Sequence, residues 1–253
     1  AIFISEKQQT ELIVLILAPL AAALTAAAGN IINDIYDVET DRVSHPNRIL
    51  VLRSLSIKEA WIEYLIFNSV SVFLAIYLSP ILLIIVLLTI FLLFIYSAFL
   101  KRLPLIGNII IALVTGLAFI YGGYVVENPK ASIIPAVFAF LINLIREIVK
   151  DIQDIDGDLK LNFKTFAIRF GIDSSKYLVV IITIILILFT LYPFIQNIYK
   201  IEYFILVMVL VNPILILCIK FLFNKSKQTN LKIISGLLKF NMLLGLIAIF
   251  LGK

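Results

Sequence analysis

The sequence predicts an all-α protein that crosses a membrane several times. Of its 253 residues, 62% are hydrophobic and only 15% are charged, whereas a soluble domain is about half apolar and about a quarter charged. Continuous apolar runs of about twenty residues recur along the chain, and each is long enough to cross a bilayer as a helix. The runs do not alternate between apolar and polar residues, which argues against the strands of a membrane barrel.

We expect eight spanning helices in a single transmembrane domain that covers residues 1–253. The first helix ends where a group of acidic residues begins, and Pro80 separates the second helix from the third. The expected ranges are 11–34, 58–78, 81–100, 105–125, 132–150, 176–193, 202–223 and 231–251. Residues 1–10 would then lie outside the cell, and the chain starts at Ala1, so we also expect a further helix before this sequence.

The connecting segments predict the orientation of the helices. Those after the first, third, fifth and seventh helices are rich in Lys and Arg, whereas the loops on the opposite side hold only Lys130 and Lys200. Because Lys and Arg accumulate in cytoplasmic loops, the basic side is expected to face the cytoplasm in a multi-pass protein of the cell membrane. The same bias explains the formal net charge of +5 without a nucleic-acid partner.

Two short stretches on this basic side hold seven of the eight aspartates. On a helix, positions i, i+4 and i+8, or i, i+3 and i+7, lie on one face. The first stretch has the former spacing at Asn33, Asp37 and Asp41. The second has the latter spacing at Asp151, Asp154 and Asp158. Each stretch is therefore expected to present one acidic face.

These acidic faces predict a site for a hard divalent cation. Carboxylates at membrane depth are costly and usually functional, and two acidic faces repel each other unless a cation lies between them. Carboxylate and amide oxygens select Mg²⁺ or Ca²⁺. One cysteine, Cys218, and one histidine, His45, exclude an internal disulfide and metal sites rich in Cys or His. Because a few carboxylates usually hold Mg²⁺ together with substrate phosphates, we expect a magnesium–phosphate or magnesium–diphosphate site.

Basic residues close to the acidic stretches are expected to bind the phosphate oxygens that the metal leaves free. These residues are Arg42, Arg48, Lys101, Arg102, Arg146 and Lys150. Cations farther from the acidic stretches, such as Lys160, Lys164 and Arg169, are interpreted as residues that set the topology and extend toward the membrane surface.

These segments resemble motifs of the UbiA superfamily of intramembrane prenyltransferases. Residues 33–41 (NDIYDVETD) resemble its NDxxDxxxD motif, and residues 151–158 (DIQDIDGD), preceded by REIVK, resemble its DxxDxxxD motif. Residues 96–102 (YSAFLKR) are similar to its YxxxLKR-type segment. The order, spacing and helix pattern agree over essentially the whole chain. The superfamily has nine helices, which would make the expected additional helix the first.

The resemblance implies a reaction and its residues. Two Mg²⁺ ions would join the diphosphate of a polyprenyl donor to the acidic faces, the donor's C–O bond would ionise, and an acceptor would attack the allylic cation. The implied metal ligands are Asn33, Asp37, Asp41, Asp154 and Asp158, with Asp34 and Asp151 as further candidates. The implied catalytic residues are Asp37, Asp41, Asp154, Asp158, Tyr96 and Lys101. Tyr36, Tyr96 or a nearby Phe would shelter the cation through its ring, and Tyr96 would also contact substrate.

Residues 96–108 and 163–171 are most similar to the archaeal digeranylgeranylglyceryl phosphate synthases. That resemblance implies transfer from geranylgeranyl diphosphate to geranylgeranylglyceryl phosphate, in ether-lipid synthesis among membrane lipids. A lipid-phosphate acceptor would also fit the surplus of cations on the basic side. One loop departs from the pattern: residues 44–53 read SHPNRILVLR, where relatives read like NKPxRPIPSG.

Other functions remain open at this point. An aromatic prenyltransferase that acts on a 4-hydroxybenzoate-like acid or quinone precursor would carry the same motifs. A cation transporter would hold its acids near the middle of the membrane on broken helices, whereas these lie at helix ends. The DGxxAR-type motif of CDP-alcohol phosphotransferases is absent from the sequence. The length of the donor chain and the oligomeric state are left open.

Overall fold

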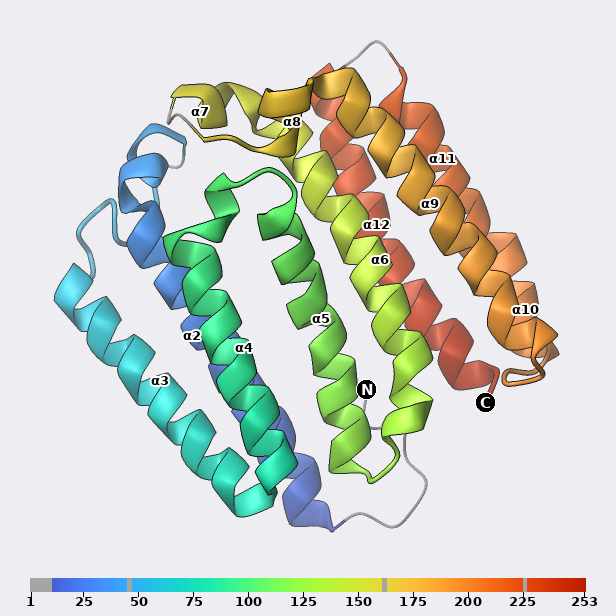
Figure 1. Cartoon of the computed structure of the whole chain (residues 1–253), viewed down its shortest axis with the longest axis horizontal. Coiled ribbons are helices and arrows are strands. Elements are labelled where there is room, and N and C mark those ends of the chain that lie inside the picture. The colour runs from blue at the N-terminus through green and yellow to red at the C-terminus, as the bar shows by residue number, and fades with distance from the viewer. Residues whose placement is uncertain (1–10, 45–46, 161–162, 225–226) are drawn as a thin grey trace. The chain divides into compact units, whose positions relative to one another are not determined.

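The computed structural model describes residues 11–44, 47–160, 163–224 and 227–253, and within these residues every regular element is a helix (Figure 1). The elements are α2 (Leu12–Ser44), α3 (Ile57–Leu78), α4 (Pro80–Ala98), the 3₁₀-helix η1 (Leu100–Arg102), α5 (Ile106–Val125), α6 (Pro129–Gln153), α7 (Ile155–Lys160), α8 (Phe166–Phe170), α9 (Ile172–Ile195), α10 (Ile201–Leu206), the π-helix η2 (Val207–Val211), α11 (Asn212–Leu222) and α12 (Lys227–Leu251). The predicted all-α fold is confirmed.

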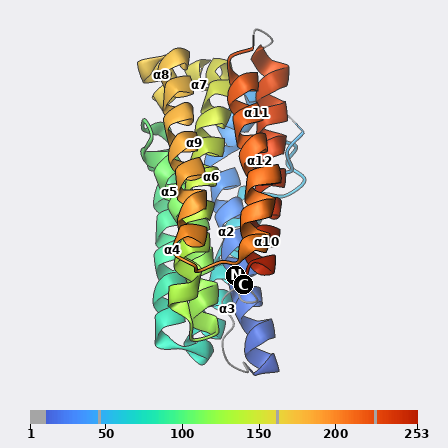
Figure 2. The same ribbon diagram turned by 90° about the vertical axis from the view of Figure 1, so that its right-hand side faces the viewer.

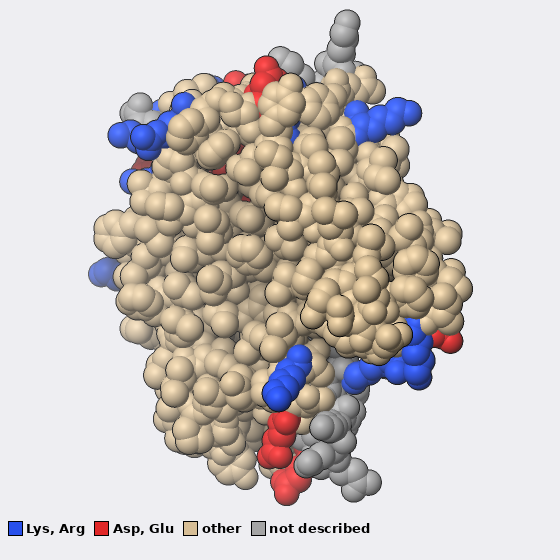
Figure 3. Space-filling view, turned by 45° about the vertical axis from the view of Figure 1, so that its right-hand side comes forward, with Lys and Arg blue, Asp and Glu red and all other residues tan. Residues whose placement is uncertain are grey.

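Eight helices in the described part of the chain are long and apolar enough to span a membrane, as predicted. On the face seen in Figure 3, most charged side chains lie toward the top and the bottom of the view, and the surface between them is largely uncharged. The first helix differs from the prediction, because α2 continues to Ser44 and contains the whole first acidic stretch. Hydropathy marks only the part of a helix that contacts hydrocarbon, while backbone hydrogen bonds continue beyond it. Residues 1–10, expected outside the cell, lie outside the described residues.

The chain divides into two compact units. One comprises Ala1–Ile110 and Leu117–Ser132, and the other comprises Ile111–Gly116 and Ile133–Lys253. The first acidic stretch lies in the first unit and the second stretch in the second unit. The single domain expected from the sequence stays a prediction.

In the first unit, α2 packs along α3 and α4 (Figure 1). The hydroxyl oxygens of Thr25 and Ser71 lie 2.6 Å apart, and Ser71 also donates to the carbonyl of Ala21 at 2.8 Å. Gly29 lets α2 approach α4, because a Cβ there would lie 2.6 Å from Cδ1 of Leu93. Small residues and interhelical hydrogen bonds of this kind hold helices together in membranes. They fix the helix that carries the first acidic stretch.

In the second unit, α11 lies beside α9 and α12 (Figure 2). The π-helix η2 ends directly before Asn212 and Pro213, and proline has no N–H to continue the helical hydrogen bonds. Asn241 Nδ2 donates to the carbonyl of Val211 at 3.2 Å, and the side chain of Asn212 contacts Thr190 Oγ1 at 3.2 Å. The seventh predicted span is therefore one span composed of α10, η2 and α11.

Candidate active site

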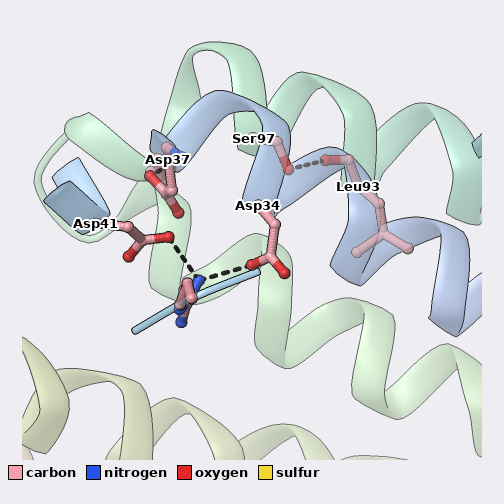
Figure 4. A network of polar contacts seen from close by, with 7 residues as sticks. Asp34, Asp37, Asp41, Leu93 and Ser97 are labelled. Carbon is pink, nitrogen blue, oxygen red and sulfur yellow. Dashed lines mark hydrogen bonds and ion pairs between the residues drawn. The ribbon is translucent and has the colours of Figure 1, made fainter. Parts of the chain in front are cut away.

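The last three turns of α2 carry Asn33, Asp34, Asp37 and Asp41. Asp34 and Asp41 are two turns apart on one face, and a single guanidinium joins them. Nη1 of Arg48 donates to Oδ1 of Asp34 at 2.6 Å and to Oδ2 of Asp41 at 2.9 Å (Figure 4). The side chain of Asp41 is only 6% exposed. Because a buried carboxylate needs a compensating charge, the contact with Arg48 stabilises this acidic face.

Asp37 has a different partner, Lys101 of η1. Lys101 Nζ donates to Asp37 Oδ1, and the two side chains are 6% and 15% exposed. Burial lowers the pKa of Lys101, and the charge of Asp37 opposes that shift. The pairing with Asp37 thus counteracts part of the effect of burial on Lys101, in a site that is largely shielded from water.

Gly107, at the start of α5, lets this lysine segment approach. A Cβ at Gly107 would lie 2.9 Å from both the Lys101 Cα and the Leu100 carbonyl oxygen, and 3.3 Å from Cε2 of Tyr96. The predicted site residues Tyr96 and Lys101 therefore both pack against the same glycine. Tyr36, on α2, packs edge-to-face on Phe94 with ring centroids 6.1 Å apart.

The second acidic stretch crosses the boundary between α6 and α7. α6 ends at Gln153 and α7 begins at Ile155, so Asp151 and Asp158 lie on two helices rather than on the one that was expected. The backbone path is nearly continuous, because Asp154 N donates to the Lys150 carbonyl at 2.9 Å and Asp158 N donates to the Asp154 carbonyl at 3.0 Å. Asp151, Asp154 and Asp158 are all half-buried.

Arg146 precedes this stretch on α6 and is held by its own helix. Its Nη1 donates to Asn143 Oδ1 at 2.8 Å and lies 3.1 Å from Glu147 Oε1. Neither Asn143 nor Glu147 was predicted as a site residue. Asn143 lies three positions before Arg146 and Glu147 one position after it, and this spacing was the sequence signal that could have identified them as contacts of Arg146. Lys150, one turn further along α6, is exposed.

Two predicted basic residues lie at the edge of the site. Arg42 forms a surface ion pair with Glu39 at 2.9 Å, with side chains that are 49% and 76% exposed. Arg102 is exposed at the end of η1. Residues 45–46, in the loop that departs from the UbiA pattern, lie outside the described residues.

The donor set fits Mg²⁺ only if a substrate completes the coordination. Among the described residues, no three Asp, Glu, His or Cys side chains come close enough to hold a metal ion by themselves. Each acidic stretch offers carboxylate oxygens, which suit a hard cation, and Mg²⁺ usually keeps several water or phosphate ligands. The residues therefore fit a metal that binds together with a phosphate group rather than one enclosed by protein.

Comparison with known proteins decides the family. The model of the UbiA prenyltransferase family matches residues 1–244. The chain belongs to the UbiA prenyltransferase family. A UbiA relative, digeranylgeranylglyceryl phosphate synthase of Methanosphaera stadtmanae, is 35% identical over 240 residues, which cover 94% of this chain and 87% of the relative.

Solved structures of UbiA proteins agree with the fold. One, from work on digeranylgeranylglyceryl phosphate synthase in membranes, has a TM-score of 0.79 and 29% identity, covering 99% of this chain and 89% of the other. A UbiA homologue from Archaeoglobus fulgidus bound to GPP and Mg²⁺ has a TM-score of 0.71 and 19% identity, covering 97% of this chain and 90% of the other. The resemblance noted from the motifs is confirmed, and this UbiA protein is a multi-pass membrane prenyltransferase.

Proposed function

We propose that this protein transfers a geranylgeranyl group from geranylgeranyl diphosphate to geranylgeranylglyceryl phosphate. The name and coverage of the Methanosphaera relative support this acceptor, as does the similarity of residues 96–108 and 163–171 to that subfamily. The product is an ether lipid with two prenyl chains. An aromatic acceptor is the alternative that the experiment below separates from this proposal.

The observation that carries the proposal is the pairing of acids and cations at the end of α2. Asp34 and Asp41 share Arg48, and Asp37 is bonded to Lys101. A magnesium diphosphate brings both a cation for the carboxylates and an anion for the basic side chains. Such a ligand can therefore satisfy all five side chains, whereas a metal ion or an anion alone would satisfy only one kind.

Each acidic stretch supplies carboxylates to the magnesium–diphosphate site in this proposal. The proposed metal ligands are Asn33, Asp34, Asp37, Asp41, Asp151, Asp154 and Asp158. The A. fulgidus homologue bound to GPP and Mg²⁺ supports the choice of ion. When bound, Mg²⁺ stabilises the negative charge that develops on the leaving diphosphate.

The basic residues stabilise the same leaving group. Arg48 and Lys101 donate hydrogen bonds to diphosphate oxygens, and Arg42, Arg102, Arg146 and Lys150 add positive charge around them. The bond between C1 of the donor and the diphosphate oxygen breaks, and its electron pair leaves with the diphosphate. Tyr36 and Tyr96 present aromatic rings to the positive allylic carbon.

The acceptor then completes the transfer. The free hydroxyl oxygen of geranylgeranylglyceryl phosphate attacks C1 of the donor and forms an ether bond, and the hydroxyl proton is released. The products are diphosphate and digeranylgeranylglyceryl phosphate. Positioning and charge stabilisation supply the rate enhancement, because no covalent bond to the protein is required.

We further propose that the acidic stretches face the cytoplasm. The loop after α2, the segment η1 and the region from α7 to α8 carry Arg48, Arg53, Lys101, Arg102, Lys160, Lys164 and Arg169. At the opposite ends of the spans, the first turn of α6 carries Lys130, and Lys200 lies directly before α10. This asymmetry supports the orientation through the positive-inside rule.

The proposal is tested by incubating the purified protein with geranylgeranyl diphosphate, Mg²⁺ and one acceptor at a time. We expect a product with geranylgeranylglyceryl phosphate, its loss on chelation by EDTA, and its return when Mg²⁺ is restored. A product with 4-hydroxybenzoate and none with geranylgeranylglyceryl phosphate would overturn the assignment of the acceptor. Wild-type turnover by the Asp37→Ala and Asp154→Ala variants would overturn the assignment of the metal ligands.

A further inference from the structure

A buried chain of hydrogen bonds links α5 to Arg146 within the second unit. Asn143 Nδ2 donates to Thr115 Oγ1 at 2.9 Å, and Asn143 Oδ1 accepts from Arg146 Nη1 at 2.8 Å. Asn143 is only 2% exposed. Gly116 allows this close approach of the two helices, because a Cβ there would lie 3.1 Å from the carbonyl oxygen of Ala136.

The donors and acceptors of this chain fix the orientation of the Asn143 amide. The Thr115 hydroxyl donates to the Ile111 carbonyl at 2.9 Å, so its oxygen remains as an acceptor for Asn143 Nδ2. Arg146 has only donors, so it must face the Asn143 oxygen. If the amide were rotated by 180°, its NH₂ group would face the N–H donors of Arg146, and its oxygen would face the acceptor oxygen of Thr115. Thr115 therefore sets the amide, and the amide sets the guanidinium.

The bonds of Arg146 leave one edge of its guanidinium for another ligand. The contacts to Asn143 and to Glu147 both use Nη1. Nε is buried and has no hydrogen-bond partner among the described residues. A buried donor without an acceptor is costly, and the edge formed by Nε and Nη2 matches two oxygens of a phosphate group. The unpaired Nε thus points to a ligand that supplies an oxyanion.

The position of Arg146 agrees with such a ligand. Arg146 and Lys150 follow at i and i+4, so they lie along one side of α6, which ends at Gln153 directly before Asp154. The side chain of Lys150 is exposed, whereas that of Arg146 is partly buried. The helix that carries both cations thus leads directly into the second acidic stretch.

We infer that Asn143 is a positioning residue, which holds Arg146 by Nη1 so that the Nε–Nη2 edge binds the oxygens of a substrate phosphate group. The inference rests on the proposed function, because it assigns Arg146 to a substrate. That phosphate belongs either to the diphosphate of the donor or to the phosphate of the acceptor. Asn143 itself acts only through Arg146 and is not a catalytic residue.

The test compares the wild type with Asn143→Ala, Arg146→Ala and the double variant in the prenyl-transfer assay. We expect each single variant to raise the KM of one substrate about tenfold or more, as the loss of a charge-assisted contact does. The substrate with the raised KM identifies which phosphate is bound. The double variant should match Arg146→Ala alone, since two residues that act through one contact are not additive.

Further variants keep the test decisive if Asn143→Ala fails to fold. Asn143→Asp retains an acceptor for Arg146, so its KM should stay close to the wild-type value. Thr115→Val removes the acceptor that orients the amide and should raise the same KM by a smaller factor. Asn212→Ala is the matched control, because Asn212 is also a buried asparagine bonded to a threonine in this unit. It should leave both KM values unchanged.

Several outcomes would overturn the inference. Additive effects in the double variant, or an unchanged KM in folded Thr115→Val and Asn143→Ala proteins, would show that the chain of bonds is only structural. If Arg146→Ala raises a KM and the other variants do not, the proposed function stands and the positioning role fails. If the wild type makes no lipid product, the Kd for geranylgeranyl diphosphate replaces KM, and an unchanged Kd in all variants then overturns the inference.

Discussion

Lys101 donates a hydrogen bond to Asp37, although 64 residues separate them along the chain. The pair ties η1 to the acidic end of α2, and both side chains are largely withdrawn from water. Within the acidic stretch of α2, Asp37 is therefore bound by a lysine, whereas Asp34 and Asp41 are bound by Arg48. Its contacts and those of Arg48 lead to separate predictions.

Replacing Lys101 by methionine should reduce both stability and turnover. The variant leaves the Asp37 charge buried without a partner, which should lower the free energy of unfolding by about 3 kcal/mol. It also removes a donor to the leaving diphosphate, which should lower kcat about a hundredfold. Thermal unfolding in detergent and the transfer assay measure the two effects.

The double variant Lys101→Met with Asp37→Asn separates these causes. Removing both charges should recover most of the lost stability, while turnover stays low because the donor and the carboxylate are both absent. A Lys101→Met protein as stable as the wild type would contradict the burial of this ion pair.

Arg48→Ala should bind Mg²⁺ more tightly in the absence of substrate, by about tenfold. The guanidinium contacts Asp34 and Asp41 and therefore competes with a metal ion for the same carboxylates. Titration calorimetry with Mg²⁺ measures this change, and kcat/KM should fall because Arg48 no longer binds the diphosphate.

Lys176→Ala is the control for this experiment. Lys176 pairs with Asp173, whose side chain is 85% exposed and lies outside the proposed site, and such surface pairs contribute little. Its Mg²⁺ affinity should equal that of the wild type. Unchanged or weaker Mg²⁺ binding by Arg48→Ala would remove Asp34 and Asp41 from the set of metal ligands.

Gly107→Ala should impair catalysis without preventing folding. The added Cβ would lie 2.9 Å from backbone atoms of Leu100 and Lys101, so η1 must shift and Lys101 must move relative to Asp37. We expect kcat to fall about tenfold or more, because small displacements of a charged donor weaken its stabilising effect.

Gly245→Ala is the matched control, because a Cβ at Gly245 would meet no atom within 4 Å. Alanine favours a helix interior over glycine, so this variant should be at least as stable as the wild type and equally active. Equal activity of Gly107→Ala and Gly245→Ala would show that the position of η1 does not matter to catalysis.

Cysteine labelling tests the proposed orientation. The native Cys218 is buried and is replaced by alanine in the background. Asn47 and Gln196 are exposed and lie in loops expected on opposite sides of the membrane. In sealed inside-out vesicles, a membrane-impermeant thiol reagent should label Asn47→Cys and spare Gln196→Cys. The reverse pattern would place the acidic stretches outside the cytoplasm.

The apolar spans were predictable because their signal is local. A run of about twenty apolar residues must satisfy its own backbone in hydrocarbon, and a helix does so within the segment. The helix ends were less predictable. α2 extends to Ser44 and α9 begins at Ile172, because polar residues beyond the hydrocarbon still form helical hydrogen bonds that hydropathy does not detect.

By itself, the sequence determined the membrane-spanning helical fold, and it predicted a site made of two acidic stretches and the cations beside them. This prediction was possible because charged residues at membrane depth cost free energy, so their presence in an apolar chain indicates a function. Only the tertiary structure decided how they pair. Arg48 joins Asp34 to Asp41, Lys101 reaches Asp37, and Thr115 orients Asn143. These contacts connect different helices or loops, and helix packing, rather than spacing along the chain, brings such groups within hydrogen-bond distance.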